Sequence, residues 1–128
     1  MEALNAREEV VERFTSRPVR RIEIPEIATI RQGLLDSTTT DRGTSTDVFA
    51  GFGKPVYGKT GTAQIDGKPD QSWYVAYVPD PERPIVVAAV IQNGGFGAQA
   101  AAPAVRQILS QWFYGTPGRA VAGSSTTN

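Results

Sequence analysis

The residues best suited to chemistry in this sequence lie in one short stretch, GKPVYGKTGTAQ, at positions 53–64. Gly53, four further residues and then Gly58-Lys59-Thr60 satisfy the pattern G-x-x-x-x-G-K-[ST] of nucleotide-binding loops. In such a loop, backbone amides and the lysine hold the phosphates of a nucleotide. The stretch therefore raises two possibilities: a phosphate site, or a lysine with neighbouring hydroxyls that serves another reaction.

The residues around the lysine do not fit a phosphate loop. Such a loop needs a helix directly after the Lys-Thr pair, because the helix N-terminus supplies the amides and the dipole that hold phosphate. Pro55, Val56 and Tyr57 are instead typical of an extended strand. Gly61 interrupts any helix that would follow. The context therefore excludes a nucleotide site and places Lys59 on a strand.

The composition leaves few kinds of chemistry. A chain of 128 residues has the length of one ordinary domain. It contains no His and no Cys, which excludes thiolate nucleophiles, disulfides and almost all structural zinc sites, and we expect neither metal nor cofactor. Thirteen Lys and Arg balance thirteen Asp and Glu, so we expect no nucleic-acid partner. No apolar run approaches the roughly 20 residues that cross a bilayer, so we expect the chain itself to be soluble.

Three candidate strands surround or follow the lysine, at Pro55–Ile65, Ser72–Val78 and Pro84–Gln92. Asp66-Gly67, between the first two, suits the positive backbone angles of a hairpin turn. Residues 79–84 begin and end with proline, which favours a tight reversal before the third strand. The pattern therefore predicts an antiparallel meander of three strands.

Two apolar segments are expected to build the core with this meander. The unbroken apolar run Ile85–Ile91 indicates a strand that is covered on both faces and does not lie at an exposed edge. After a glycine-rich connection, apolar residues recur at helical spacing. They predict a helix with a wide apolar stripe that should lie on the sheet. Its residues are Val105, Ile108, Leu109, Trp112 and Phe113.

The sequence of the N-terminal part predicts two helices with a strand or extended connection between them. Asn5 and Glu8 have the spacing of a helix cap, so residues 1–18 are interpreted as a connecting helix. Residues 19–24 alternate like a half-exposed strand or extended connection. A second helix should begin at Pro25 and bury one face, made of Ile27, Ile30 and Leu34.

Small polar residues dominate two further segments. Residues 37–47 have a loop composition, and we interpret their Ser and Thr as turn residues. Residues 115–128 have little to bury and are predicted to form a disordered tail. Together these patterns divide the chain into a connecting helix (1–18), a folded portion (19–114) and the tail.

With its lysine on a strand, the segment Lys59–Gln64 resembles the Lys-Thr-Gly box of penicillin-binding proteins and serine β-lactamases. The flanking segments resemble the elements around that box in the family: Ile30–Leu34 the preceding helix, Ser72–Pro79 and Ile85–Asn93 the next two strands, and Ala101–Pro103 the start of the C-terminal helix. The resemblance covers residues 19–114 and is closest to the class B transpeptidases that cross-link peptidoglycan. It implies an α+β fold, with an antiparallel sheet flanked by helices.

The resemblance also implies roles for five residues. Thr60 and Thr62 would hydrogen-bond the carboxylate of a D-alanyl-D-alanine peptide or of a β-lactam, and Lys59 would supply positive potential beside the nucleophile. Gly61 would let the peptide lie against the strand edge. The Thr62 backbone N–H would form half of the oxyanion hole, and Gln64 would line the cleft. Without the resemblance, Lys59 could equally be a charged residue that protects an edge strand from aggregation.

Two further family signatures are missing from this sequence. Its lysines, at positions 54, 59 and 68, are preceded at three positions by Gly51, Val56 and Ile65, so no Ser-x-x-Lys pair carries a nucleophile. No Ser-x-Asn occurs either. We therefore expect the chain to be the C-terminal segment of a transpeptidase, inactive alone, with the nucleophilic serine on an N-terminal segment that is its partner.

The resemblance leaves other functions open. The same fold serves β-lactam sensors, non-catalytic peptidoglycan-binding modules and β-lactamases. For a transpeptidase, it implies peptidoglycan stem peptides and β-lactam antibiotics as ligands. It also implies a location at the extracytoplasmic face of the bacterial membrane, to which only an N-terminal anchor outside this sequence would attach the protein.

Overall fold

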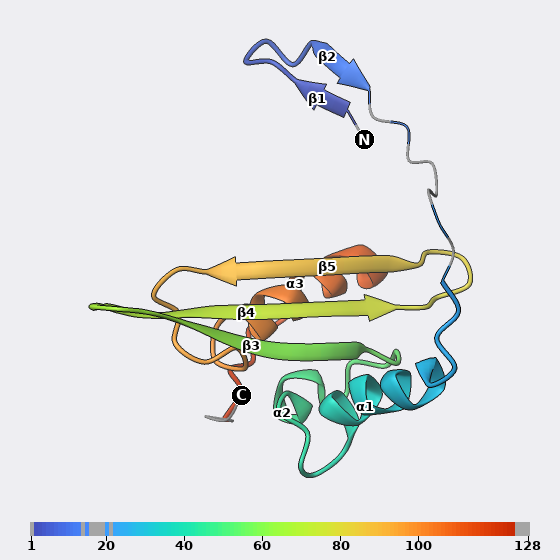
Figure 1. Cartoon of the computed structure of the whole chain (residues 1–128), viewed down its shortest axis with the longest axis vertical. Coiled ribbons are helices and arrows are strands. Elements are labelled where there is room, and N and C mark those ends of the chain that lie inside the picture. The colour runs from blue at the N-terminus through green and yellow to red at the C-terminus, as the bar shows by residue number, and fades with distance from the viewer. Residues whose placement is uncertain (1, 14, 16–19, 21, 125–128) are drawn as a thin grey trace.

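The structure of the chain, a computed structural model, describes residues 2–13, 15, 20 and 22–124. Along the chain its elements are β1 (Glu2–Leu4), β2 (Val10–Arg13), α1 (Ile27–Thr39), α2 (Thr46–Phe49), β3 (Tyr57–Ile65), β4 (Lys68–Val78), β5 (Ile85–Ile91) and α3 (Ala101–Tyr114). The strands β3, β4 and β5 form one sheet, with α3 on one face and with α1 and α2 beside β3 (Figure 1). The β1–β2 hairpin lies apart from this sheet.

The three-stranded sheet is the antiparallel meander that the sequence predicts. Its order is β3-β4-β5, and each neighbouring pair is antiparallel. In the register, Lys59 lies opposite Val75 and Gly61 lies opposite Trp73. The turn between β3 and β4 falls at Asp66-Gly67. The predicted α+β class is therefore confirmed, and the Lys-Thr-Gly segment lies on an edge strand.

The core lies between the sheet and the helices. Tyr74, Ala76 and Val78 alternate along β4 and are all buried, because successive strand residues point to opposite faces. The intervening Trp73 and Val75 lie on the other face and are 40% and 45% exposed. From α3, the helical stripe buries Val105, Leu109 and Phe113, which share one side of the helix. The sheet is thus covered on one face only by the described chain.

Two cations, Arg83 and Lys54, attach the end of α3 and the segment before β3 to the turn between β4 and β5. The guanidinium of Arg83 donates to the carbonyl oxygens of Trp112 and Phe113 at 3.0 Å each. These carbonyls lie in the last turn of the helix, where the helix dipole favours a positive charge. The ammonium of Lys54 donates to Asp80 at 2.6 Å, which joins the segment before β3 to the same turn. The sheet and α3 are therefore held in one arrangement at this end.

The prediction of a connecting helix over residues 1–18 is wrong for the described residues 2–13. They form the β1–β2 hairpin, and residues 14 and 16–18 lie outside the described part. The side chain of Asn5 accepts hydrogen bonds from the amides of Arg7 and Glu9 at 2.9 and 3.1 Å. An asparagine that bonds the backbone two residues ahead begins a turn, so the same residue type that caps helices here reverses the chain.

Four further predictions are only partly correct. Residues 19–24 were expected to form a half-exposed strand or an extended connection; residues 20 and 22–24 are not in a strand, and the other two lie outside the described part. Ile27 and Ile30 on α1 are 40% and 49% exposed, because the described chain packs nothing over them. The expected loop at 37–47 instead contains the last turn of α1 and the first two residues of α2.

The fourth concerns β5, which was expected to be covered on both faces. It lies at the edge of the sheet, where Val86 is 71% exposed. Residues 115–124, the described part of the predicted disordered tail, form neither helix nor strand. They still contact the rest of the chain, since the amide of Gly123 donates to the carbonyl of Ala98 at 3.1 Å.

The packing of α3 on the sheet can be tested by comparing a buried residue of its apolar stripe with an exposed one. Leu109 is fully buried, whereas Ile108 beside it is 47% exposed. Leu109→Ala should lower the free energy of unfolding by about 2–5 kcal/mol, because it leaves a cavity in the core. Ile108→Ala should cost less than about 1 kcal/mol. Urea denaturation of the two variants measures both values, and equal losses would contradict the packing.

The Lys54–Asp80 pair predicts a pH dependence of stability. The hydrogen bond from Lys54 lowers the pKa of Asp80 from 3.8 to about 2. Since the folded-state pKa lies below the unfolded one, the pair stabilises the fold above about pH 4, and this contribution is lost as the pH falls toward 2. The stability deficit of Asp80→Asn should therefore shrink between pH 5 and pH 2.5 in urea titrations. A deficit of Asp80→Asn that stays constant over this pH range would contradict the role of the pair.

Candidate substrate-binding strand

The outer edge of β3, which faces away from β4, is clamped at its start by two hydroxyls of α1. Ser37 Oγ donates to the carbonyl oxygen of Gly58 at 2.7 Å, and Thr38 Oγ1 donates to that of Val56 at 2.6 Å. Both hydroxyls also bond carbonyls one helical turn back, at Leu34 and Leu35. The last turn of α1 therefore fixes where β3 begins and how it is oriented.

Beyond Gly58 the same edge is open. Along a strand, the amide and carbonyl of one residue point to one side and those of the next residue to the other. Since the Gly58 carbonyl points outward, the backbone groups of Thr60 and Thr62 also point outward, while Lys59 and Gly61 pair with β4. No strand of the described chain pairs with this edge. The amides of Thr60 and Thr62 thus face outward without a partner strand in the described chain, whereas the Thr60 carbonyl accepts a hydrogen bond from the Lys59 side chain.

The side chains of this segment gather a cation and hydroxyls near the open edge. Lys59 is exposed, and its Nζ donates to the carbonyl oxygen of Thr60 at 2.8 Å. Thr60 is buried, and its hydroxyl donates to that of Thr44 at 3.1 Å. Lys59 and Thr44 both line a shallow hollow of about 330 Å³ that also includes Arg42. Asp36 also lines the hollow, so two cationic side chains and one acidic one leave it with an excess of positive charge, which suits an anion that accepts hydrogen bonds.

The Thr62 hydroxyl makes no hydrogen bond within the described chain. Its Oγ1 atom is buried and has no partner among the described residues. Most buried hydroxyls have one. Turning this side chain toward a ligand would therefore break no hydrogen bond within the described chain.

A buried tyrosine supports β3 from below. Tyr74 Oη and Ser45 Oγ are 2.8 Å apart, and burial raises the pKa of Tyr74 to about 12, so the phenol stays neutral. A Cβ atom on Gly58 would lie only 1.9 Å from Tyr74 Oη. Only glycine allows the strand to pass this close to the ring. The residue before Lys59 is therefore held by packing below as well as by Ser37 at its edge.

All five predicted site residues lie on β3, but not at one point. Lys59, Thr60 and Thr62 lie at or beside the open edge, and Gly61 lies between them opposite Trp73. Gln64 is exposed, further toward the hairpin turn, and does not line the hollow. The roles given to these residues by resemblance stay predictions.

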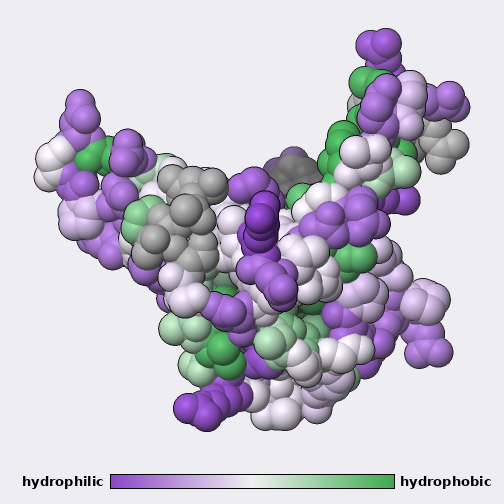
Figure 2. All heavy atoms as spheres, turned by 90° about the horizontal axis from the view of Figure 1, so that it is seen from below, coloured by the Kyte–Doolittle hydropathy of each residue, from purple (hydrophilic) through white to green (hydrophobic). Residues whose placement is uncertain are grey.

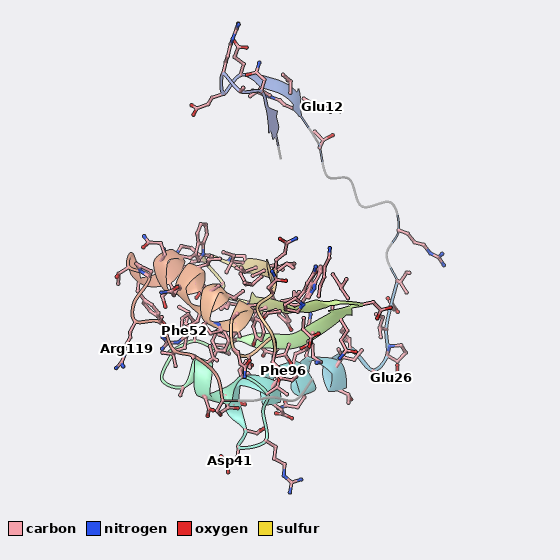
Figure 3. All side chains as sticks on the ribbon, turned by 90° about the vertical axis from the view of Figure 1, so that its left-hand side faces the viewer. Glu12, Glu26, Asp41, Phe52, Phe96 and Arg119 are labelled. Carbon is pink, nitrogen blue, oxygen red and sulfur yellow. The ribbon has the colours of Figure 1, made fainter. Side chains whose placement is uncertain are left out.

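Sequence reasoning missed the hydroxyls that precede β3. Ser37, Thr38 and Thr44 were interpreted as turn residues, yet Ser37 and Thr44 bond β3 and Thr38 bonds Val56, the residue before that strand. Figure 3 shows the loop between α1 and α2 reaching away from the sheet at Asp41, whereas its two ends return to β3. The side of the molecule with α1 and α2 has a mainly polar surface with small, separate apolar groups (Figure 2). The only signal in the sequence is the density of hydroxyls before the strand.

Neither a metal centre nor a membrane span is built by the part of the chain that the structure describes. There, no three acidic side chains come together as metal ligands would. Its helices are also too short or too polar to cross a bilayer.

The clamp on β3 can be tested by removing one hydroxyl. Thr38→Val keeps the shape of the side chain but leaves the Val56 carbonyl without its hydrogen bond. It should lower the free energy of unfolding by about 1–3 kcal/mol. Thr39→Val, on the exposed side of the same turn, is the control and should stay within about 0.5 kcal/mol of the parent. Chemical denaturation gives both values, and a loss at Thr39 as large as that at Thr38 would argue against the clamp.

Comparisons with known proteins show which family this chain resembles. Residues 11–110 match the family model described as penicillin binding protein transpeptidase domain. The peptidoglycan D,D-transpeptidase MrdA of Haemophilus influenzae is 27% identical over 71% of this chain and 17% of its own length. The crystal structure of Pseudomonas aeruginosa PBP2 in complex with WCK 5153 superposes with a TM-score of 0.60 and 32% identity. That match covers 66% of this chain and 18% of the PBP2 chain.

The chain thus spans less than a fifth of either relative. The family match covers most of the chain, and the strand order and the helices on the sheet agree with it. On these grounds the chain belongs to the penicillin-binding protein transpeptidase domain family.

Proposed function

We propose that this chain is the C-terminal segment of a peptidoglycan D,D-transpeptidase and that β3 is its substrate-binding strand. The observation that carries the proposal is the open outer edge of β3, where Lys59, Thr60 and Thr62 follow one another beyond the clamp. The name of the Haemophilus influenzae relative supports this reaction class. Residues 19–114 would form the segment's share of the transpeptidase domain.

The ligand of this edge is a peptide that ends in a carboxylate. The hydroxyls of Thr60 and Thr62 donate to the carboxylate, and hydrogen bonds to a charged group are among the stronger ones in proteins. Turning Thr62 outward loses no existing bond. The Lys59 ammonium, which donates to the carbonyl oxygen of the neighbouring Thr60 at 2.8 Å, adds a positive potential beside this edge.

The stem peptide would lie along β3 as an added strand. Its extended backbone pairs with the outward amides and carbonyls of Thr60 and Thr62, which no strand of the described chain occupies. Gly61 adds no side chain that would displace the peptide. The Thr62 amide then points at the reacting carbonyl and forms half of the oxyanion hole, while Gln64 lines the cleft further along.

The nucleophile belongs to a segment outside this sequence. Its serine oxygen attacks the penultimate D-alanine carbonyl, the peptide bond breaks, and the terminal D-alanine leaves with the proton on its amine. An amine of a neighbouring stem peptide then takes the acyl group and releases the serine. A β-lactam would acylate the same serine. The chain alone carries out neither step, because it lacks Ser-x-x-Lys.

That partner segment should cover the uncovered face of the sheet. Lys59 lies on this face together with Val75 and Val86, which are 45% and 71% exposed. An apolar edge strand such as β5 is normally paired or protected. The whole protein would work at the extracytoplasmic face of the membrane, attached through an anchor outside this sequence.

Labelling with a fluorescent penicillin tests the proposal. The chain is combined with the native segment that carries Ser-x-x-Lys, joined or separate. We expect the label on the serine of that segment, and none on this chain alone. Lys59→Met or Thr60→Val should lower the acylation rate about 10- to 100-fold, as expected when a hydrogen bond to a charged group is lost.

Lys68→Met is the matched control, because Lys68 is an exposed lysine at the start of β4 near the hairpin turn. It should acylate at the parent rate, and circular dichroism should show that every variant is folded. An ester on this chain, or parent rates in both Lys59→Met and Thr60→Val, would contradict the proposal.

A further inference from the structure

A hydroxyl outside the Lys-Thr-Gly segment lies in direct contact with it. Thr44, in the loop between α1 and α2, accepts a hydrogen bond from Thr60 at 3.1 Å between the two Oγ1 atoms. Thr44 lines the same hollow as Lys59. It is therefore the residue from outside β3 that is placed to set the direction of the Thr60 hydroxyl.

The residues on both sides hold Thr44 in place. A Cβ atom on Gly43 would lie 2.6 Å from the carbonyl oxygens of both Asp36 and Ser37, so only glycine lets the loop pass this close to α1. On the other side, the amide and the hydroxyl of Ser45 both donate to the Ser37 carbonyl, at 2.9 and 3.0 Å.

Ser45 is also fixed on its other side. It is 1% exposed, and its hydroxyl is 2.8 Å from that of the buried Tyr74. The loop is thus anchored to α1 and to β4 at the residues that flank Thr44. Its hydroxyl is presented to Thr60 from a backbone that has little freedom to move.

Because the Thr44 and Thr60 hydroxyls are hydrogen-bonded to each other, Thr44 can affect how Thr60 binds a carboxylate. A hydroxyl has one proton to donate and two lone pairs that accept. In the structure Thr60 gives its proton to Thr44. A carboxylate takes that proton instead, and the Thr44 hydroxyl can then turn and donate to Thr60. Hydrogen bonds in such a chain strengthen one another, so the donor facing the carboxylate becomes stronger.

We infer that Thr44 is a positioning residue that orients the Thr60 hydroxyl toward the substrate carboxylate. This inference rests on the proposed function of β3. It assigns Thr44 no contact with the substrate and no part in proton transfer to the nucleophile. Its effect should therefore appear only with ligands that carry the carboxylate.

Acylation kinetics of the assembled protein test the inference. Thr44→Val removes the hydroxyl and keeps the branched shape, whereas Thr44→Ser keeps the hydroxyl. With benzylpenicillin, Thr44→Val should acylate about 3- to 10-fold more slowly, and Thr44→Ser near the parent rate. With benzylpenicillin methyl ester, in which the carboxylate is blocked, Thr44→Val and the parent should react at equal rates. Thr39→Val is the control for a nearby lost hydroxyl.

The double variant Thr44→Val/Thr60→Val adds a second criterion. It should be no slower than Thr60→Val alone, because Thr44 acts through Thr60. A merely structural role would slow the acid and the ester equally and would add to the effect of Thr60→Val. Either of those results, or an unchanged rate for Thr44→Val with the acid, would overturn the inference.

A measurement on the chain by itself separates this inference from the function on which it rests. Three-bond couplings of the Thr60 side chain report its χ1 rotamer by NMR. We expect one fixed rotamer in the parent and in Thr44→Ser, and averaging in Thr44→Val. An assembled parent that a penicillin does not acylate would overturn the proposed function, whereas a fixed Thr60 rotamer in Thr44→Val would overturn the role of Thr44.

Discussion

The structure depends on one edge strand whose outer side is held at its start and has no partner strand in the described chain along the rest. Ser37 and Thr38 bond the carbonyls of Gly58 and Val56, and the edge beyond them has no partner strand in the described chain. An edge strand is normally short, covered or charged, because free backbone groups recruit other strands. Here the clamp sets the strand's position, so the open part of the edge is held in place for the peptide that we propose to bind there.

The support beneath the strand follows from buried polar groups that satisfy one another. The Tyr74 and Ser45 hydroxyls are bonded in the core, and Ser45 ties the loop to the last turn of α1. Such a network is costly if any member is removed, so it fixes a single arrangement. The opposite face of the sheet is different, with Val86 largely exposed. That asymmetry agrees with a chain that spans less than a fifth of its relatives.

Local patterns in the sequence were sufficient for the meander, the helix α3 and the placement of Lys59 on a strand, because alternation, turn residues and the apolar stripe all agreed there. The local patterns gave wrong predictions where one residue type suits two different local structures. Asn5 suited a helix cap and a turn equally well, and tertiary contacts decide between them. The hydroxyls of Ser37 and Thr44 looked like loop residues, because their partners on β3 lie far along the chain. Ile27 and Val86 were expected to be buried, but the surfaces that would cover them are not formed by the described chain.

Amide hydrogen exchange along β3 tests the central claim most directly. In the free chain, the amides of Lys59 and Gly61 should be protected by β4, while those of Thr60 and Thr62 should exchange rapidly with solvent. In the assembled protein with a D-alanyl-D-alanine peptide bound, the Thr60 and Thr62 amides should become protected. Protection of Thr60 and Thr62 already in the free chain, or rapid exchange that the bound peptide does not slow, would contradict the account.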